Sequence, residues 1–300
     1  MKITERKLQE ISGSLLITLP RDWTKSFKLK KGSKLKIQNA KNGTLTISPY
    51  DIHEEKKDKV IINYDKYFIR NFFRQYFLGY ENIVVKFEAK DRVKKLEVYF
   101  VLKKFMNAQV IEEKEDKVLV KCFKIDELSI KECLNRMFFL SMNAMDELLE
   151  DNNKEILKEI DENVTKFYYM LVMQVRRYID EGKFTEHNEI SLLHALDCRM
   201  VAEKIKRTSE LIRDFPKISD NKMSKFLSEV KIHYHNSYMY FYNHKFDKAI
   251  QLIEPETKLR LNILHFIETA NKKKNLTLFE QARDLDFIIG YSRNISMLTR

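Results

Sequence analysis

Glycine and proline are scarce in this sequence: only 6 of its 300 residues are glycine and only 4 are proline. Folds that bind nucleotides through glycine-rich loops need glycine at several fixed positions, and turn-rich β-sandwiches need both residues in number. Both fold classes are therefore poor candidates. The same scarcity favours long helices, which exclude glycine and proline from their interiors.

Cysteine is also rare, with three residues far apart at Cys122, Cys133 and Cys198. No two of them form a C-x-x-C pair. A structural zinc site and a disulfide framework both need closely spaced or paired cysteines. We expect neither in this chain.

Long apolar runs are missing as well. No stretch of about 18 uncharged apolar residues occurs, so no membrane-spanning helix is expected. The first ten residues, MKITERKLQE, contain no apolar segment of the kind found in secretory signal peptides. These absences predict a cytoplasmic protein in a reducing compartment.

Positive charge is present in excess and is concentrated at one end. The whole chain has a net charge of +11. Residues 1–49 contain eleven Lys and Arg residues against three Asp and Glu, a net charge of +8. Such a block is typical of a nucleic-acid-binding module. A solubilising basic arm is the alternative, but the block is patterned rather than low in complexity.

The pattern within this block predicts short β-strands, which lie at residues 15–19, 34–37 and 44–47. The last two alternate apolar and polar residues, and Asn42-Gly43 between them is a strong hairpin signal. Pro20 is expected at the first position of a helical turn, and Lys31-Gly32 at a turn before the next strand. About 45 residues with strands this short cannot bury enough apolar surface alone, so we expect a homodimer.

The segment SGSLLITLPRDWTKSFKLKKGSKLKI, residues 12–37, resembles the AbrB/SpoVT swapped-hairpin DNA-binding domain. The shared features are a small-residue turn, a strand that ends in proline, a short helix and a Leu-x-x-Gly-Ser-x-Leu strand start. The resemblance covers roughly residues 3–49 and implies that two chains interleave hairpins and present basic residues to double-stranded DNA. The DNA-facing candidates that it implies are Arg6, Lys7, Arg21, Lys25, Lys30 and Lys31.

Residues 50–58 are polar and are expected to form a linker. The next segment, residues 58–125, has a pattern that predicts the order β-α-β-α-β-β and therefore a small α/β domain. We interpret it as a spacer or dimerisation element. A packed core is a better explanation than a ligand pocket for its aromatic residues Tyr67, Phe68, Phe72, Phe73, Tyr76 and Phe77.

From Ser129 onward the periodicity predicts helices, with Thr277 as the N-cap of the last one. The six expected segments are 130–150, 152–181, 187–214, 218–243, 246–271 and 277–299. Short links between long helices favour antiparallel bundles. We expect two three-helix halves, at residues 126–215 and 216–300. The predicted fold is multi-domain α+β, with residues 1–50 as the DNA-binding and dimerisation module.

The helical half resembles the phosphate-uptake regulator (PhoU) family, a tandem pair of three-helix repeats. The segment MFFLSMNAMDELLEDNNKEILKEIDENVTKFYYML resembles the family's first two helices, and RMVAEKIKRTSELI and LDFIIGYSRNISML resemble the third helix of each repeat. The combination of modules resembles archaeal PhoU-like transcription factors with an AbrB/SpoVT domain. This resemblance spans nearly the whole chain and implies a role in phosphate uptake or homeostasis.

The family's metal chemistry depends on acids four residues apart, which share one helix face. The corresponding pairs here keep the first acid and lose the second: Asp161/Thr165, Glu203/Arg207, Glu254/Lys258 and Asp286/Gly290. Arg207 and Lys258 are expected to form intrahelical ion pairs with those acids. A family-type iron, zinc or magnesium cluster is therefore not expected, and neither is any other cofactor.

The remaining candidates point to structure rather than chemistry. His233 and His235 are two residues apart, so they lie on different helix faces and form a poor metal pair. Tyr234, Tyr238 and Phe241 have the spacing of a core-facing helix stripe. No combination of nucleophile and base is visible, so no enzymatic activity is expected.

The sequence thus predicts a dimeric DNA-binding transcriptional regulator whose helical half senses a signal or a partner. The alternative is a PhoU-like adaptor that binds a transporter ATPase or a sensor protein, with the hairpin module serving only for dimerisation. A third hypothesis is a metal-binding regulator.

Overall fold

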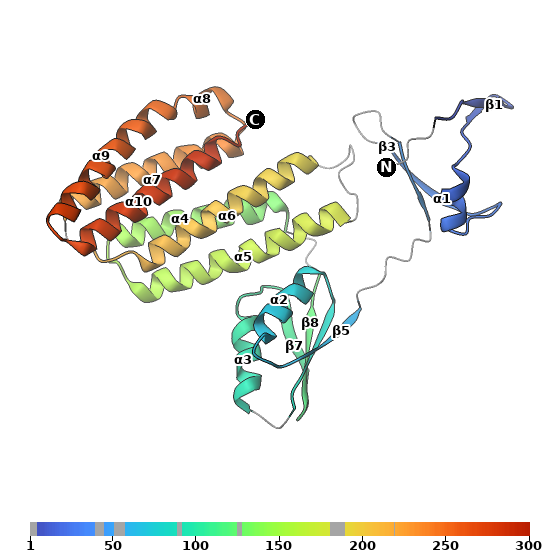
Figure 1. The fold of residues 1–300 in the computed structure, drawn as a ribbon, viewed down its shortest axis with the longest axis horizontal. Helices are drawn as coiled ribbons and strands as arrows, with labels where there is room; N and C mark the ends of the chain where they lie inside the picture. The colour runs from blue at the N-terminus through green and yellow to red at the C-terminus, as the bar shows by residue number, and fades with distance from the viewer. Residues whose placement is uncertain are drawn as a thin grey trace. The chain divides into compact units, whose positions relative to one another are not determined.

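The computed structural model describes residues 5–39, 45–50, 58–88, 92–124, 128–180, 190–218 and 220–300. The fold is mixed α/β, with short strands near the N-terminus and a C-terminal half that is mostly helical (Figure 1). The chain divides near residue 57 into two compact units, which are described separately below.

The first unit consists of two small antiparallel hairpins and one short helix. Its elements are β1 (Gln9–Ile11), β2 (Ser14–Leu16), α1 (Arg21–Ser26), β3 (Leu35–Asn39) and β4 (Leu45–Pro49). β1 pairs with β2, and β3 pairs with β4. Ser12 and Gly13 connect β1 to β2 with φ values of 52° and 77°. Two positive φ values in a two-residue turn match the right-handed twist of the strands.

Most of the local structure expected here is present. The pairing of β3 with β4 confirms the second hairpin, whereas its Asn42-Gly43 turn lies outside the described residues. Gly32, with a φ of 86°, forms the expected turn before β3. The position expected for Pro20 is wrong by one residue: it is the N-cap of α1, because its ψ of 131° is still extended.

The first unit has almost no interior of its own. Pro49 is the only buried residue among those whose burial is described in this unit. Its strands and the residues next to them expose many apolar side chains, including Leu8 (63%), Ile11 (57%), Leu15 (68%), Ile37 (61%) and Tyr50 (65%). Apolar burial is the main favourable term in folding, so these hairpins lack their principal source of stability within one chain.

The second unit begins with an α/β part. Its elements are β5 (Lys59–Asn63), α2 (Phe68–Phe77), β6 (Asn82–Lys86), α3 (Arg92–Leu102), β7 (Ala108–Glu113) and β8 (Lys117–Cys122). This is the expected β-α-β-α-β-β order. The sheet has the strand order β5-β6-β8-β7, in which β5 is parallel to β6 and the other pairs are antiparallel.

The aromatic residues of α2 supply the core of this part, as the sequence predicts. Phe68, Phe72 and Tyr76 are buried and pack with Phe105 beyond α3. The expectation is wrong for Tyr67, which is 56% exposed, because it lies at the N-cap of α2 outside the buried face.

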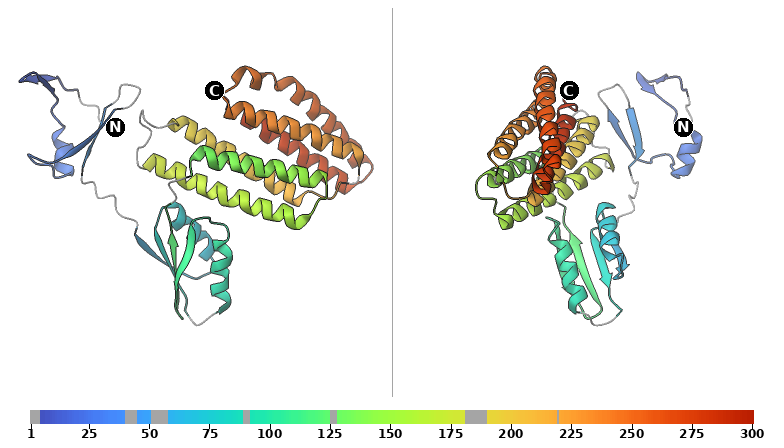
Figure 2. Two further views of the ribbon diagram at one scale, coloured as in Figure 1. Left: turned by 180° about the vertical axis from the view of Figure 1, so that it is seen from behind. Right: turned by 60° about the vertical axis from the view of Figure 1, so that its left-hand side comes forward.

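The helical part contains α4 (Ile130–Leu149), α5 (Lys154–Asp180), α6 (Leu192–Asp214), α7 (Asn221–Tyr242), α8 (Phe246–Ile250), α9 (Ile253–Lys272) and α10 (Leu276–Ser296). α4, α5 and α6 pack on one another, and α10 packs on α7 and α9. α10 also contacts α6, and α7 contacts α4, so the two sets of helices lie side by side (Figure 2). Their buried side chains form one hydrophobic core. None of the described helices is long and apolar enough to cross a membrane.

The stripe of Tyr234, Tyr238 and Phe241 lies inside this core, as expected, since each side chain is at most 1% exposed. Tyr238 stacks on Phe138 of α4 with ring centroids 3.8 Å apart. The three cysteines are free thiols, and burial raises the pKa of each to about 12.

Two details of the helix prediction are wrong. The segment 246–271 is not one helix, because α8 ends at Ile250 and α9 begins at Ile253. Pro255 explains this break: inside a continuous helix its ring would clash with the carbonyl four residues earlier, whereas in the first turn of α9 it is tolerated. The N-cap of α10 is Asn275 rather than Thr277, and its side chain accepts a hydrogen bond from the Leu278 backbone N–H (3.1 Å).

Candidate functional site

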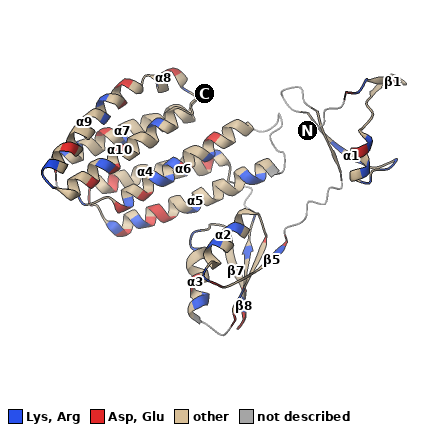
Figure 3. Ribbon diagram, in the orientation of Figure 1, with Lys and Arg blue, Asp and Glu red and all other residues tan. Residues whose placement is uncertain are grey.

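The six basic residues proposed to face DNA all belong to the first unit, and all six are exposed. They are Arg6 and Lys7 before β1, Arg21 and Lys25 in α1, and Lys30 and Lys31 before β3. None of them forms an ion pair with an acid in the described part of the chain. Figure 3 shows Lys and Arg positions along this unit. Unpaired, exposed cations are available to phosphate groups.

Arg6 and Arg21 are the two candidates that the structure brings together. Both line a hollow of about 580 Å³ that is also lined by Pro20, Trp23 and Ile47. Arg21 is the first residue of α1, and Trp23 packs on Phe27 with ring centroids 5.4 Å apart. The hollow therefore combines two guanidinium groups, which bind phosphate bidentately, with apolar walls and one carboxylate, that of Asp22.

Lys30 and Lys31 form a second basic site in the turn before β3. The Ser33 hydroxyl accepts a hydrogen bond from the Lys30 N–H (2.9 Å), and the Ser33 N–H donates to the Lys30 carbonyl (2.9 Å). These bonds, with Gly32 at positive φ, fix the backbone of the turn. Lys25 lies in the last turn of α1 and Lys7 before β1. No described contact joins these lysines to the hollow at Arg6 and Arg21.

The first of the four acidic helix positions, Asp161 on α5, is paired with an arginine. Its carboxylate accepts hydrogen bonds from Arg213 Nη1 (2.7 Å) and Ser209 Oγ (2.9 Å), both on α6. Asp161 is only 6% exposed, so its charge needs such partners. Thr165, where the motif would place a second acid, lines the same pocket as Asp161.

The carboxylate of Glu203 on α6 is also held by hydrogen bonds and ion pairs. It accepts hydrogen bonds from Tyr168 Oη (2.5 Å) and Arg207 Nε (3.2 Å), and Arg199 Nη1 lies 3.7 Å away. Burial alone would raise the pKa of Glu203, but Tyr168 and the two arginines outweigh it and lower that pKa. The expected intrahelical ion pair with Arg207 is therefore confirmed.

Of the two acidic positions on α9 and α10, Asp286 has an ion-pair partner and Glu254 has none among the described residues. Asp286 on α10 binds Arg260 of α9 through both carboxylate oxygens, at 2.7 and 3.2 Å. Glu254 and Lys258 on α9 are both exposed, and no described ion pair joins them. The prediction of an ion pair between them is wrong. Both side chains are exposed on the first turns of a helix, where water competes for their charges.

Within the described ranges, no group of three or more His, Cys, Asp or Glu side chains is placed to hold a metal ion. His233 and His235 both lie on α7. His233 is buried, with its Nε2 4.0 Å from Oε2 of Glu256 on α9, whereas His235 is exposed. The two histidines are on different faces, as their spacing predicts.

Sequence reasoning predicts Arg207 as the partner of Glu203 but misses the cations that pair with Asp161 and Asp286. Arg213 is 52 residues from Asp161, and Arg260 is 26 residues from Asp286. Nothing in a single sequence marks pairs at such separations, because they depend on which helix faces meet.

Comparison of the chain with models of known protein families, with curated protein sequences and with solved structures finds no match.

Proposed function

We propose that this protein is a dimeric DNA-binding transcriptional regulator in phosphate uptake or homeostasis. Its first unit binds double-stranded DNA and pairs with a second copy, and its helical half receives a signal or a protein partner. The phosphate role comes from the resemblance to PhoU-like transcription factors, and the DNA-binding role also has support from the residues themselves.

The observation that carries the DNA-binding proposal is that all six basic candidates are exposed and form no ion pair among the described residues, in a segment of net charge +8 over residues 1–49. Cations that the fold uses internally are paired with acids, as Arg213 and Arg260 are. The six candidates have no such internal role. Their positive field attracts the phosphate backbone, which supplies most of the affinity in protein–DNA complexes.

The exposed apolar side chains of the same unit support the dimer. Leu15 of β2 and Ile37 of β3 are more than 60% exposed in one chain. A second copy of the hairpins has the matching apolar surface, because an isologous interface uses the same patch twice. Interleaved hairpins would give the module a shared core and would place two copies of the basic residues on one DNA duplex.

Fluorescence anisotropy with a labelled duplex tests the proposal on the full chain in a salt series. We expect affinity to fall steeply from about 50 to about 200 mM salt, because each neutralised phosphate releases counterions. Replacing all six candidates with Gln is expected to abolish most binding and to flatten the slope by about 0.9 for each phosphate that is no longer neutralised.

A matched control changes six exposed lysines of the helical part to Gln, which alters the net charge equally: Lys222, Lys245, Lys258, Lys272, Lys273 and Lys274. This control variant is expected to keep the affinity and slope of the unaltered chain. Equal losses in both variants would contradict a specific DNA-binding role for the first unit. Absence of DNA binding by the full chain, together with capture of a phosphate-transporter ATPase, would instead establish the adaptor function.

A further inference from the structure

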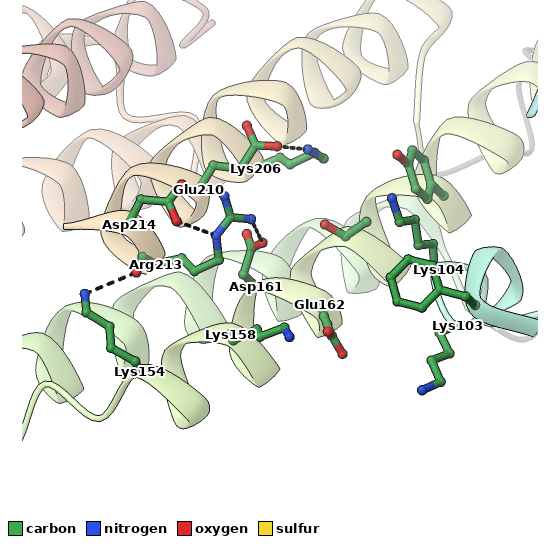
Figure 4. Close-up of a pocket in the computed structure, with 13 residues that line it drawn as sticks. Lys103, Lys104, Lys154, Lys158, Asp161, Glu162, Lys206, Glu210, Arg213 and Asp214 are labelled. Carbon is green, nitrogen blue, oxygen red and sulfur yellow. Dashed lines mark hydrogen bonds and ion pairs between the residues drawn. The ribbon is translucent and has the colours of Figure 1, made fainter. Parts of the chain in front are cut away.

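A pocket of about 530 Å³ lies in the second unit where α3, α5 and α6 approach one another (Figure 4). Its volume is within the range of small-molecule sites, roughly 300 to 1,000 Å³. Six cationic side chains line it: Lys103, Lys104, Lys154, Lys158, Lys206 and Arg213. None of these belongs to the DNA-binding candidates of the first unit.

The acids of the pocket do not neutralise these cations. Four acids line it, against six cations. Asp161 and Asp214 share the single cation Arg213, at 2.7 and 2.6 Å, and Glu210 pairs with Lys206. Only Glu162 remains without an ion pair among the described acids of the pocket.

Four of the six cations have no described ion pair, and with all four acids counted the pocket has a net charge of +2. Lys103, Lys104 and Lys158 have no described ion pair. Lys154 donates hydrogen bonds to the carbonyl oxygens of Phe215 and Arg213, and its charge also interacts with the carboxylate of Asp214. In Figure 4, Lys103 and Lys104 reach the pocket from just beyond α3, and Lys154 and Lys158 lie along α5. Like charges gathered in one pocket repel one another, and a bound anion relieves that repulsion.

Aromatic side chains complete the lining. Phe100 of α3 and Tyr169 of α5 border the pocket. Tyr169 also stacks on Phe105 with ring centroids 5.4 Å apart, which holds its ring in place. A second pocket of about 340 Å³ shares Tyr169 and Lys206 with the first and adds Arg176 and Arg199. The cationic surface therefore continues along α5 and α6, past the aromatic rings.

We propose that this pocket binds a small phosphorylated ligand. Lysine ammonium groups bind phosphate as mobile point charges, and the pocket's net charge of +2 matches the charge of a phosphate group. Phe100 and Tyr169 provide faces on which a flat ring can stack. The shared chemistry is the phosphate group, which inorganic phosphate or a nucleoside phosphate can supply. This inference goes beyond DNA binding and does not rest on it.

Isothermal titration calorimetry of the full chain tests the proposal, with inorganic phosphate and ADP as separate probes. At least one probe is expected to bind with an affinity better than about 1 mM. Binding of phosphate alone identifies a simple anion site, and tighter binding of ADP identifies a nucleoside phosphate site. Either result supports the proposal, and the absence of heat from both probes would overturn it.

Two variants locate the binding in this pocket. K103Q/K104Q/K158Q removes the three unpaired lysines, all exposed enough for the fold to tolerate the change, and is expected to weaken binding at least about tenfold. K272Q/K273Q/K274Q makes the same charge change at the end of α9 and is expected to leave the affinity within about twofold. Equal weakening in both variants would show attraction to net charge rather than a site, and would contradict the proposal.

The variant F100A separates stacking from charge. Phe100 is 64% exposed, so its loss is not expected to unfold the chain. If ADP binds, F100A should weaken ADP about tenfold or less while leaving phosphate affinity unchanged. Thermal unfolding of each variant confirms that the fold is intact, and DNA binding, which uses the other unit, serves as an independent readout.

Discussion

At the scale of single residues, arginine side chains occupy the carboxylates of three of the four acidic helix positions. Asp161, Glu203 and Asp286 each have arginine partners that occupy their oxygens. A carboxylate held by a guanidinium has its charge balanced and its lone pairs engaged, so it gains little from a divalent cation. The arginines therefore balance the charge of these three carboxylates.

His233 is the residue from which we expect a clear pH effect on stability. Burial lowers its pKa from 6.5 to about 4. Between these values the unfolded chain binds more protons than the folded chain, so stability rises with pH through this window. Lowering the pH from 7 to about 4.5 should cost about 2 to 3 kcal/mol through this residue. Urea unfolding at the two pH values measures the loss.

The variant H233Q isolates this contribution, because glutamine does not titrate. The neighbouring Glu256 acts in the opposite direction: burial raises its pKa, although Arg293 and Arg260 oppose the rise, so its protonation at low pH favours the folded chain. The difference between the parent chain and H233Q removes that background. Identical pH dependence in the two proteins would show that His233 is not held neutral by its surroundings.

The ends of the helices show how far local sequence fixes an element. Ser129 and Glu132 form a complete capping box at the start of α4, with Ser129 Oγ accepting from the Glu132 N–H (3.1 Å). At α10 two polar residues compete for the same role, and Asn275 takes it although Thr277 has a glutamate three residues later. Asparagine is a better N-cap than threonine, and its use adds two residues to the helix.

Substitutions at the start of α10 test whether Asn275 or Thr277 is the N-cap. N275A removes the acceptor of the Leu278 N–H and is expected to lower the free energy of unfolding by about 1 kcal/mol. T277A, in the exposed first turn, should change it by no more than about 0.5 kcal/mol. Chemical denaturation measures both, and a larger loss in T277A would contradict the assignment of the cap.

The elements of this chain were more predictable than its contacts. Periodicity predicts α4, α5, α7 and α10 to within a few residues, and also the β-α-β-α-β-β order, because both depend on neighbouring residues. α6 begins at Leu192, and the first residues of the expected segment 187–214 lie outside the described ones. The break before α9 depends on Pro255, which prevents one continuous helix over 246–271. The pocket of Lys103, Lys104 and Lys158 depends on how α3 meets α5. No local pattern encodes that approach, and lysines in a highly charged sequence are not distinctive.

At the scale of the whole molecule, the two units differ in how they are stabilised. The second unit has a continuous hydrophobic core across its helices and a second core around its sheet. The first unit has no comparable interior among its described residues. A chain of this design is expected to keep its helical part folded alone and to depend on association for its N-terminal hairpins.

The oligomeric state tests this dependence. Light scattering coupled to size exclusion is expected to give twice the chain mass of 36.1 kDa. The variant L15E introduces a charge on an exposed β2 position that the second copy should cover, and it is expected to give monomers. The control L261E changes a leucine of α9 that is also exposed, at 61%, and should remain dimeric. A monomeric parent chain, or a dimer in L15E, would contradict association through the hairpins.

Almost none of the described side chains of the first unit is buried, and under the proposed dimer this makes the function depend on the amount of protein in the cell. A module that gains its core only from a second copy is stabilised by mass action, so its folded fraction depends on protein concentration. DNA occupancy would then rise more steeply than in proportion to protein level, because dilution removes both the partner and the fold. DNA binding would then have a threshold in protein concentration. Below that concentration the well-packed helical unit would stay folded as a monomer, without a DNA-binding surface.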